Sequence, residues 1–354
     1  MIGPVLLFGS GETSPNGRKA FELAFRYLSE HRPKDEPPKV ALLETPAGFE
    51  LNSYQVIGRV ANFLEERLQN YNPQTTIVRA RKRGTSLSPD DPEMAALIMT
   101  SDMIFLGPGS PTYAVRQLRD SLTWQAVQYC NREGAVLALA SAAVLSISSY
   151  TLPVYEIYKV GEDLHWVEGL DFFQPFGVNT AFIPHWNNND GGEELDTSRC
   201  FMGMERFEKL INMLPPETVI TGIGENSALW IDPQACVCEV AGIGEVVVLR
   251  EGIETHFQAG EKFPLEVLRG CSEPMPLPDA LLSQVEGIIE SSEKENVEDQ
   301  APQPTGEVLE LVKQREDARK RRDWQEADQL RDQVTDQGWK ITDTPDGPKV
   351  EKNE

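Results

Sequence analysis

The sequence has no long apolar run and no N-terminal targeting pattern. None of its 354 residues fall in a stretch near the roughly 20 consecutive apolar residues of a membrane-spanning helix, so no membrane association is expected. Met1 is followed not by a basic segment and an apolar core, as in a secretory signal, but by an apolar run typical of a first strand. The sequence therefore predicts a cytoplasmic protein.

Cysteines are few and widely scattered. Their positions show neither the paired spacing of a disulfide framework nor the four-ligand spacing of a zinc site. They are Cys130, Cys200, Cys236, Cys238 and Cys271. The pattern favours reduced cysteines in the core over metal ligands, and no metal or organic cofactor is expected.

Positive charge is scarce, because 33 Lys and Arg residues stand against 56 Asp and Glu, a formal net charge of −23 at pH 7. A nucleic-acid surface over the whole protein is thereby excluded, since phosphate binding needs local positive potential. Much of the acidity falls in residues 273–305, which are rich in Pro, Ser, Glu and Gln. Such a segment buries too little apolar surface to offset its ordering entropy. It is predicted to be a mobile linker between domains at 1–272 and 306–354.

The first domain alternates strand-like apolar runs with amphipathic helical stretches, the pattern of a parallel sheet covered by helices. The predicted strands are Pro4–Phe8, Lys39–Leu43, Thr76–Ala80, Asp102–Leu106 and Gly134–Leu139, and the predicted helices are Arg18–Glu30, Tyr54–Gln69, Pro92–Thr100 and one from Pro111 to Leu118 and beyond. From about Val219, short β-like runs between Gly and Pro turns predict hairpins that close the domain. The fold class is α/β, with a doubly wound, mostly parallel sheet.

Ser141 is the candidate nucleophile. It follows the last of these strands and is flanked by Ala140, Ala142 and Ala143. A nucleophile on a sharp strand-to-helix turn needs small neighbours, and the turn holds its hydroxyl above the carboxyl edge of the sheet. Small residues at a strand end also serve close helix packing, which remains the alternative.

A glycine turn, Gly107-Pro108-Gly109-Ser110, follows the preceding strand. Backbone N–H groups at Gly109 and Ser110, together with that of Ala142, can hold a developing oxyanion. The alternative is an ordinary turn in which Ser110 only caps the next helix.

His185 is the candidate general base. It is one of four histidines and lies at the end of an apolar stretch, in the polar sequence Pro184-His185-Trp186-Asn187. Such a histidine can accept the hydroxyl proton and return it to a leaving amine. A structural role is the alternative for any lone histidine.

These motifs in this order, strand-Gly-x-Gly-helix, strand-Ser-Ala and Pro-His-aromatic, resemble the aspartyl dipeptidase (peptidase E) and cyanophycinase family of serine peptidases, over roughly residues 5–249. The resemblance implies a class I glutamine amidotransferase-like, flavodoxin-like three-layer fold. It also implies that Glu156 is the carboxylate that orients the histidine, and it matches the stretch from Gly222 to Glu225. Ala143 stands where the family has glycine, and its Cβ is expected to narrow the space for a substrate.

Polar and aromatic residues near the histidine predict a pocket for a small peptide or amino-acid-like ligand, with aromatic packing under a loop as the alternative. The substrate-binding candidates are Tyr155, Tyr158, His165, Trp186, Asn187 and Glu225. Arg116, Arg199 and Arg206 are candidates for a carboxylate clamp, although most arginines lie at the surface or between helices.

The C-terminal part predicts a separate two-helix hairpin. Apolar residues recur at helical spacing from Val308 to Ala318 and again from Ala327 to Val334, and Trp339–Ile341 forms a short extended tail. Its Arg and Asp pattern, with Asp323-Trp324 at the turn, closely resembles the C-terminal domain of cysteinyl-tRNA synthetases. That resemblance implies a tRNA-associated unit.

The basic residues of the hairpin are the candidates for a weak tRNA contact, with a solvated helix face as the alternative. They are Arg319, Lys320, Arg321 and Arg322. No adenylation motif and no zinc-binding cysteine set accompany the hairpin, so ligase activity is not expected.

Three hypotheses follow. The first is a serine hydrolase that cleaves a peptide or related amide bond with Ser141, His185 and Glu156. The second is an inactive amidotransferase-like binding or regulatory protein, and the third is a tRNA-associated protein. The sequence leaves the oligomeric state open, and an oligomer is compatible with it.

Overall fold

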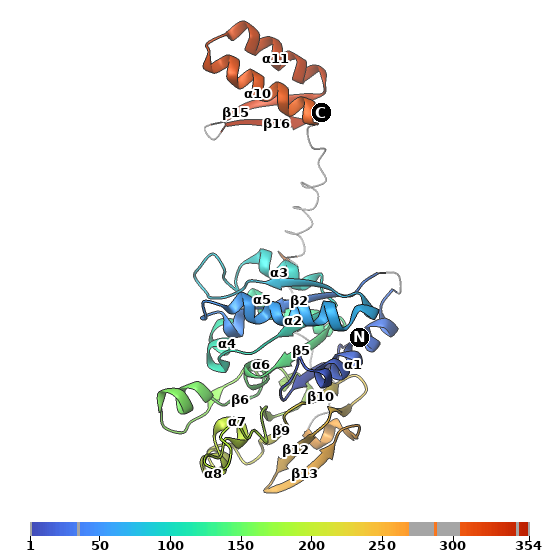
Figure 1. Cartoon of the computed structure of the whole chain (residues 1–354), viewed down its shortest axis with the longest axis vertical. Coiled ribbons are helices and arrows are strands. Elements are labelled where there is room, and N and C mark those ends of the chain that lie inside the picture. The colour runs from blue at the N-terminus through green and yellow to red at the C-terminus, as the bar shows by residue number, and fades with distance from the viewer. Residues whose placement is uncertain (1, 34–35, 269–286, 289–304, 345–346, 353–354) are drawn as a thin grey trace. The chain divides into compact units, whose positions relative to one another are not determined.

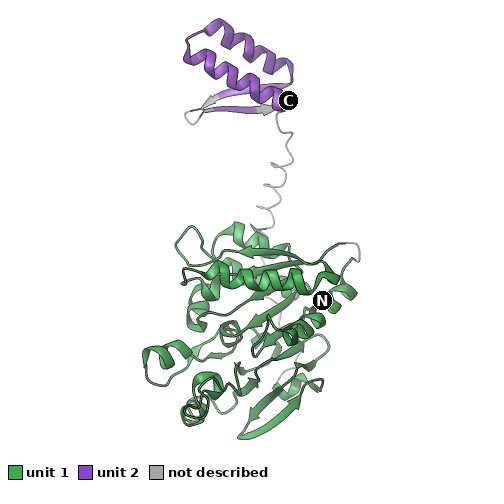
Figure 2. Ribbon diagram, viewed as in Figure 1, with its two compact units in different colours: residues 1–292 green, residues 293–354 purple. Residues whose placement is uncertain are grey.

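The computed structural model describes residues 2–33, 36–268, 287–288, 305–344 and 347–352. The chain divides into two compact units, Met1–Ser292 and Glu293–Glu354 (Figure 2). Of the predicted linker at 273–305, all but residues 287, 288 and 305 lie outside the described residues. No helix in the described part of the chain is long and apolar enough to cross a membrane.

An eight-stranded sheet forms the centre of the first unit, in the order β14-β11-β10-β1-β5-β4-β2-β3 (Figure 1). Strands β1, β5, β4, β2 and β3 are parallel neighbours, whereas β10, β11 and β14 run antiparallel to their neighbours. The strands are β1 (Val5–Phe8), β2 (Lys39–Leu43), β3 (Gln74–Val78), β4 (Met103–Leu106), β5 (Val136–Ala140), β10 (Ser227–Asp232), β11 (Val237–Gly242) and β14 (Lys262–Pro264). The predicted α/β class with a mostly parallel sheet is confirmed.

Helices cover both faces of this sheet, which explains why its parallel strands are apolar on both sides. In β1, Leu6 and Phe8 pack with helices α1 and α2, while Val5 and Leu7 pack on the opposite face with α3 and α5. The helices are α1 (Pro15–His31), α2 (Ser53–Arg67), α3 (Pro92–Met99), α4 (Pro111–Leu118), α5 (Leu122–Arg132) and α6 (Ala142–Ser146). The result is a three-layer arrangement.

Several predicted boundaries differ from the structure; for example, α1 begins three residues before the predicted Arg18, and β5 begins two residues after the predicted Gly134. The strand expected at Thr76–Ala80 lies two residues earlier, at Gln74–Val78. The helix expected to run on past Leu118 ends there, because Asp120 has a left-handed φ of 59° and Ser121 caps a new helix by accepting the N–H of Trp124 at 3.1 Å.

A second sheet, in the order β13-β12-β9-β8, completes the first unit. A cluster of buried apolar residues joins this sheet to α8. It includes Trp186 and, on α8 itself, Phe207. The remaining elements here are β6 (Tyr150–Thr151), the π-helical turn η3 (Glu156–Val160), β7 (Val167–Glu168), β8 (Thr180–Ile183), α7 (Ser198–Phe201), α8 (Met204–Ile211), β9 (Val219–Ile223), β12 (Glu245–Arg250) and β13 (Ile253–Gln258).

The second unit is a helical hairpin with a β-hairpin after it. Helices α10 (Gly306–Lys320) and α11 (Trp324–Asp336) are followed by β15 (Trp339–Thr344), which pairs antiparallel with β16 (Gly347–Lys352). The sequence predicted the two helices but only a short extended tail. Val308, Val312 and Val334 form its small core with Trp339.

Candidate active site

Ser141 lies on a sharp turn between β5 and α6. Its backbone has φ 53° and ψ −114°, a combination that a residue with a Cβ rarely adopts. Its neighbours Ala140 and Ala142 are buried, at 0% and 2% exposure, so a larger side chain at either position would have to be accommodated within the core. The turn has the features of a nucleophile elbow, in which a strained strand-to-helix connection holds the hydroxyl free.

His185 brings its imidazole to that hydroxyl. It follows β8, and its Nε2 lies 3.2 Å from Ser141 Oγ. Like Ser141 it has a left-handed φ, 54°, and its backbone N–H donates to the carbonyl of Gly9, just after β1, at 3.0 Å. The distance and the partner nitrogen suit proton transfer from the serine.

Glu225, in the turn between β9 and β10, holds the other side of the imidazole. Its Oε1 lies 3.0 Å from His185 Nδ1 and accepts a hydrogen bond from Asn188 Nδ2 at 2.9 Å. Burial tends to raise the pKa of this carboxyl, but hydrogen bonds from His185, Ser10 and Asn188 and the charge of His185 outweigh burial and lower the pKa to about 2. Glu225 is therefore ionised at neutral pH.

The expectation that Glu156 orients the histidine is not met. Glu156 begins the π-helical turn after β6, where its Oε1 accepts a hydrogen bond from Thr112 of α4. A carboxylate close to Ser141 in sequence is thus directed to α4 and not to the histidine. Glu225, expected to bind substrate, occupies the place beside the histidine because the β9–β10 turn reaches the end of β1.

The two N–H groups that can face an oxyanion are those of Gly109 and Ala142. Both residues line the cavity at Ser141, and within the described residues neither N–H has a hydrogen-bond partner. Ser110, the third candidate, donates its N–H to the carbonyl of Pro46 at 2.9 Å, and its side chain caps α4. The prediction for Ser110 is therefore corrected to a supporting role.

Gly109 cannot be replaced without moving the loop after β2. Its φ is 148°, and a Cβ there would lie 2.0 Å from the carbonyl oxygen of Pro46. That close approach fixes the glycine turn against the loop. It is a packing reason for glycine at this position, independent of any reaction.

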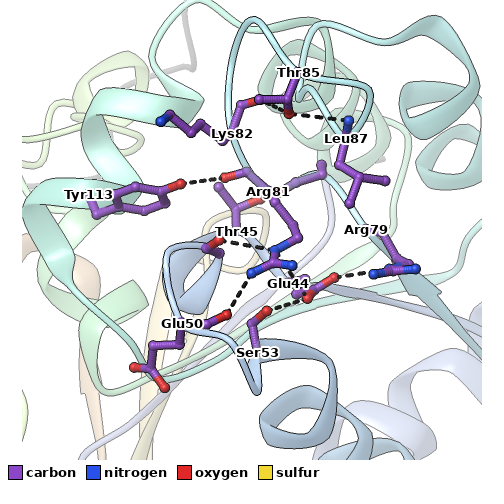
Figure 3. Close-up of polar contacts among 12 residues, drawn as sticks. Glu44, Thr45, Glu50, Ser53, Arg79, Arg81, Lys82, Thr85, Leu87 and Tyr113 are labelled. Atoms are coloured by element: carbon purple, nitrogen blue, oxygen red, sulfur yellow. Dashed lines mark hydrogen bonds and ion pairs between the residues drawn. The ribbon is translucent and has the colours of Figure 1, made fainter.

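A network of charged residues holds the loop after β2 in place. The buried carboxylate of Glu44 accepts a hydrogen bond from Ser53 and lies 3.6 Å from Arg79 Nε and 3.5 Å from Arg81 Nε (Figure 3). Arg81 also donates to two carbonyls of residues 45–50. These contacts rigidify the segment against which Gly109 packs.

The cavity at Ser141 has a volume of about 350 Å³. Tyr155 and Tyr158 line it as predicted, and Lys159, which the sequence analysis did not consider, lines it too. Burial raises the pKa of the Tyr155 hydroxyl, with a further contribution from the charge of Glu50, so this tyrosine stays neutral at physiological pH.

The other substrate-binding candidates do not line this cavity. His165 lies at an exposed loop beside Glu162. Trp186 is 3% exposed and packs in the core, where Gly222 leaves room for its indole. Asn187 accepts the backbone N–H of Glu225 through Oδ1 at 2.7 Å and so supports the histidine's partner.

None of the three clamp candidates lines the cavity either. Arg199 stacks on Trp186 and Arg116 on Tyr113, while Arg206 donates to the carbonyls of Phe201 and Met202. Ala143, in α6, is fully buried in the core and does not line the cavity. Its Cβ therefore does not narrow the cavity, contrary to the expectation.

Ser10 and Lys159 escaped the sequence analysis, and Asn188 was considered only as one of the polar residues that follow His185. Ser10 hydrogen-bonds Glu225 and accepts the N–H of Asn226 at 2.9 Å. A signal was available, because Ser10 and the buried Asn188 follow strands that end at the same edge of the molecule as Ser141 and His185.

The cysteines are only partly as expected. Cys130, Cys200 and Cys238 are buried free thiols, whereas Cys236 is disulfide-bonded, and Cys271 lies outside the described residues. In the described part of the chain, no group of three or more His, Cys, Asp or Glu side chains could hold a metal ion.

The fold has a counterpart among solved structures. A peptidase from an acI-B1 Actinobacterium superposes with a TM-score of 0.59 and 22% identity, over 75% of this chain and 97% of that chain. The chain shares that peptidase's fold. At this level of identity the likeness concerns the fold alone.

The C-terminal part has relatives of a different kind. Residues 301–347 match the family described as the cysteinyl-tRNA ligase anticodon binding domain. Cysteine–tRNA ligases of Rubrobacter xylanophilus and Methanosarcina mazei are 50% identical over 52 residues and 45% identical over 49 residues, which are 15% and 14% of this chain. The chain spans only 11% and 10% of the length of these two ligases.

Proposed function

We propose that the chain is a serine hydrolase that cleaves a peptide or related amide bond. The observation that carries this proposal is the continuous contact from Ser141 Oγ through both ring nitrogens of His185 to Glu225. Glu225 replaces Glu156 in the role that the sequence assigned. The peptidase fold of the neighbouring structure supports the same class of reaction.

The same three side chains, Ser141, His185 and Glu225, take part in both halves of the reaction: acylation of the serine and hydrolysis of the acyl-serine. His185 Nε2 takes the Ser141 proton as Oγ attacks the carbonyl carbon, and the carbonyl oxygen becomes an oxyanion facing the N–H groups of Gly109 and Ala142. The imidazolium then gives its proton to the leaving amine nitrogen, and the amide bond breaks. Water hydrolyses the acyl-serine by the reverse sequence of proton transfers. The ionised Glu225 fixes the tautomer of His185 and stabilises the imidazolium.

The cavity suits a small peptide or amino-acid-like substrate. Tyr155, Tyr158 and Phe201 supply aromatic walls, and Lys159 supplies a cation. A small substrate with a free carboxylate can place that group against the ammonium of Lys159. Lys159→Met is expected to raise KM for short peptides with a free C-terminus and to leave KM for their amidated forms unchanged.

A fluorophosphonate probe tests the proposed nucleophile. Ser141 is expected to displace fluoride from phosphorus, with its proton passing to His185, and intact-mass analysis should find one adduct that maps to Ser141. The adduct should be lost in Ser141→Ala and His185→Ala, while Ser149→Ala, a serine away from His185, keeps it. A folded wild-type chain without an adduct would rule out the hydrolase and favour a binding or regulatory protein.

A second candidate function, contact with tRNA, is favoured by one feature of the second unit. Trp324 is 60% exposed and lies two residues after the basic run Arg319–Arg322, which suits base stacking beside phosphates. Ion pairs to acidic residues engage Arg319, Lys320 and Arg321, so the positive potential available to phosphates is small. We expect weak binding.

Filter binding with tRNA at several salt concentrations tests this contact. A true phosphate contact gives an affinity that falls steeply with salt, and Trp324→Ala should weaken it at every salt concentration. The matched control is Trp166→Phe in the first unit. Equal tRNA retention by the wild type and Trp324→Ala would refute the contact.

A further inference from the structure

The segment α7 contains three successive residues in the left-handed region. Arg199 has φ 56° and ψ 49°, Cys200 has φ 57° and ψ 53°, and Phe201 has φ 68°. Residues with a Cβ visit this region as isolated cases, and none of these three is Gly, Asn or Asp. Strain of this kind persists only where surrounding contacts impose it, and it concentrates at functional sites.

The left-handed turn bonds directly to the peptide groups at His185. The N–H of Cys200 donates to the carbonyl of His185 at 3.2 Å, and the N–H of Arg199 donates to the carbonyl of Trp186 at 2.9 Å. Adjacent N–H groups of the turn thus reach adjacent carbonyls of the loop that carries the imidazole. These hydrogen bonds join backbone groups only and do not involve the imidazole of His185.

The side chain of Arg199 reinforces the same attachment. Its Nη1 donates to the carbonyl of Trp186 at 3.0 Å, and its guanidinium carbon lies 3.8 Å from the centre of the Trp186 ring. Trp186 is anchored in the core against Phe207. Arg199 therefore links the turn to a fixed point one residue from His185.

The opposite side of the loop is held by the sheet edges. The N–H of His185 donates to Gly9 at 3.0 Å, and that of Trp186 donates to Ile223 at 3.1 Å. The two peptide groups are therefore bound on both sides. Phe201 adds a ring 5.8 Å from the imidazole and lines the cavity.

The turn is itself closed by bonds at its two ends. The carboxylate of Asp196 accepts the N–H of Ser198 at 3.0 Å and that of Met204 at 2.8 Å, and the N–H of Gly203 donates to the carbonyl of Ser198 at 2.8 Å. A strained segment closed in this way can act as a rigid support.

We infer that the left-handed turn Arg199–Phe201 is a positioning element for His185, with Arg199 as its main positioning residue. This inference rests on the proposed hydrolase function and extends it, because the turn holds the imidazole between Ser141 and Glu225. Arg199 itself is not in contact with the substrate. Small displacements of a proton-transfer group are costly, and a shift of about 1 Å can lower a rate by about 100-fold.

The test measures how fast a fluorophosphonate modifies Ser141 in the full-length protein. In Arg199→Met the limiting rate of modification should fall by about 10- to 100-fold, while the probe concentration for half-maximal rate stays unchanged. Arg199→Lys, which keeps a cation over Trp186, should recover part of the rate. The split between rate and probe binding separates positioning from a change in the cavity.

Arg132→Met is the matched control. Arg132 is also partly buried and stacks on an aromatic ring, with its guanidinium carbon 4.6 Å from the centre of the Phe176 ring, at the end of α5. It should lose about as much thermal stability as Arg199→Met but keep the wild-type labelling rate. If Arg199→Met melts much lower than this control, the labelling rates of both variants are compared at a temperature at which both remain fully folded.

The outcomes separate this inference from the proposed function. If the wild type labels at Ser141 and Arg199→Met labels equally fast, the turn is not a positioning element and the hydrolase proposal stands. If Arg199→Met and Arg132→Met slow labelling to the same extent, a general loss of stability is responsible and the inference fails. If the wild type does not label at all, the hydrolase proposal fails first.

Discussion

Glu225 and Glu156 lie in two loops of the first unit, and the two glutamates have opposite surroundings. Glu225, between β9 and β10, accepts hydrogen bonds at one oxygen from His185 and Asn188. Glu156, after β6, is bonded to Thr112 through one oxygen, and its Oε2 is buried with no hydrogen-bond partner in the described part of the structure. The position of the loop in the fold, and not the residue type, therefore determines which glutamate carboxylate can hydrogen-bond His185.

The largest expected difference between the two loops lies in the chemical step. Glu225→Gln keeps the shape of the side chain but removes the charge that stabilises the imidazolium and favours the wrong tautomer. The rate of fluorophosphonate labelling at Ser141 should fall by about 10²- to 10⁴-fold. Labelling kinetics followed by intact-mass analysis would measure this fall. A reduction below threefold would contradict a larger role for Glu225 than for Glu156.

A smaller effect is expected from a neighbour of Glu225. Asn188→Ala removes one hydrogen bond to the carboxylate but leaves those from His185 and Ser10, so labelling should slow by about tenfold, roughly 1.4 kcal/mol in the barrier. Asn212→Ala, which removes a bond to a carbonyl on α8, is the control and should label at the wild-type rate.

The pH dependence of stability should follow the same carboxylate. Because the folded-state pKa of Glu225 is about 2, below the ordinary 4.5, its ionised form stabilises the fold fully above about pH 4.5. That contribution is lost as the pH falls through about 2. The difference in free energy of unfolding between wild type and Glu225→Gln should therefore shrink between pH 4.5 and pH 2, as urea titrations at several pH values would measure. A constant difference would contradict the lowered pKa.

The smallest effect is expected at the second glutamate. Glu156→Gln keeps an oxygen that can accept the Thr112 hydrogen bond, and Glu156 does not contact His185. The rate of labelling should change by less than about threefold. Removal of a general acid or base, by comparison, lowers a rate by about 10²-fold or more. Loss of labelling as severe as in Glu225→Gln would restore the role that the sequence suggested for Glu156.

Much of the site could be predicted because it depends on where parallel strands end. Ser141 directly follows β5 and Gly109 lies three residues after the end of β4, and the apolar runs that mark these strands are plain in the sequence. His185 was found by the same argument from β8. Ser141 and Gly109 converge at one edge because β4 and β5 pair in parallel, whereas β8, which precedes His185, belongs to the second sheet.

The rest could not be predicted because it depends on contacts between distant loops. Glu225 is 40 residues from His185, and its place depends on how the second sheet meets the first. The direction of the Ser110 N–H depends on Pro46, which no local pattern links to it. The burial of Trp186 likewise depends on the distant Gly222 of β9, which leaves room for the indole.

The backbone at Ser141 has a consequence for how this protein can change over generations. Its φ of 53° is a conformation that glycine adopts freely and that costs other residues on the order of 1 to 3 kcal/mol. A lineage released from selection for hydrolysis would gain stability from Ser141→Gly in a single step. Backbone stability alone therefore favours glycine at this position, and Ser141 occupies it at a cost in stability.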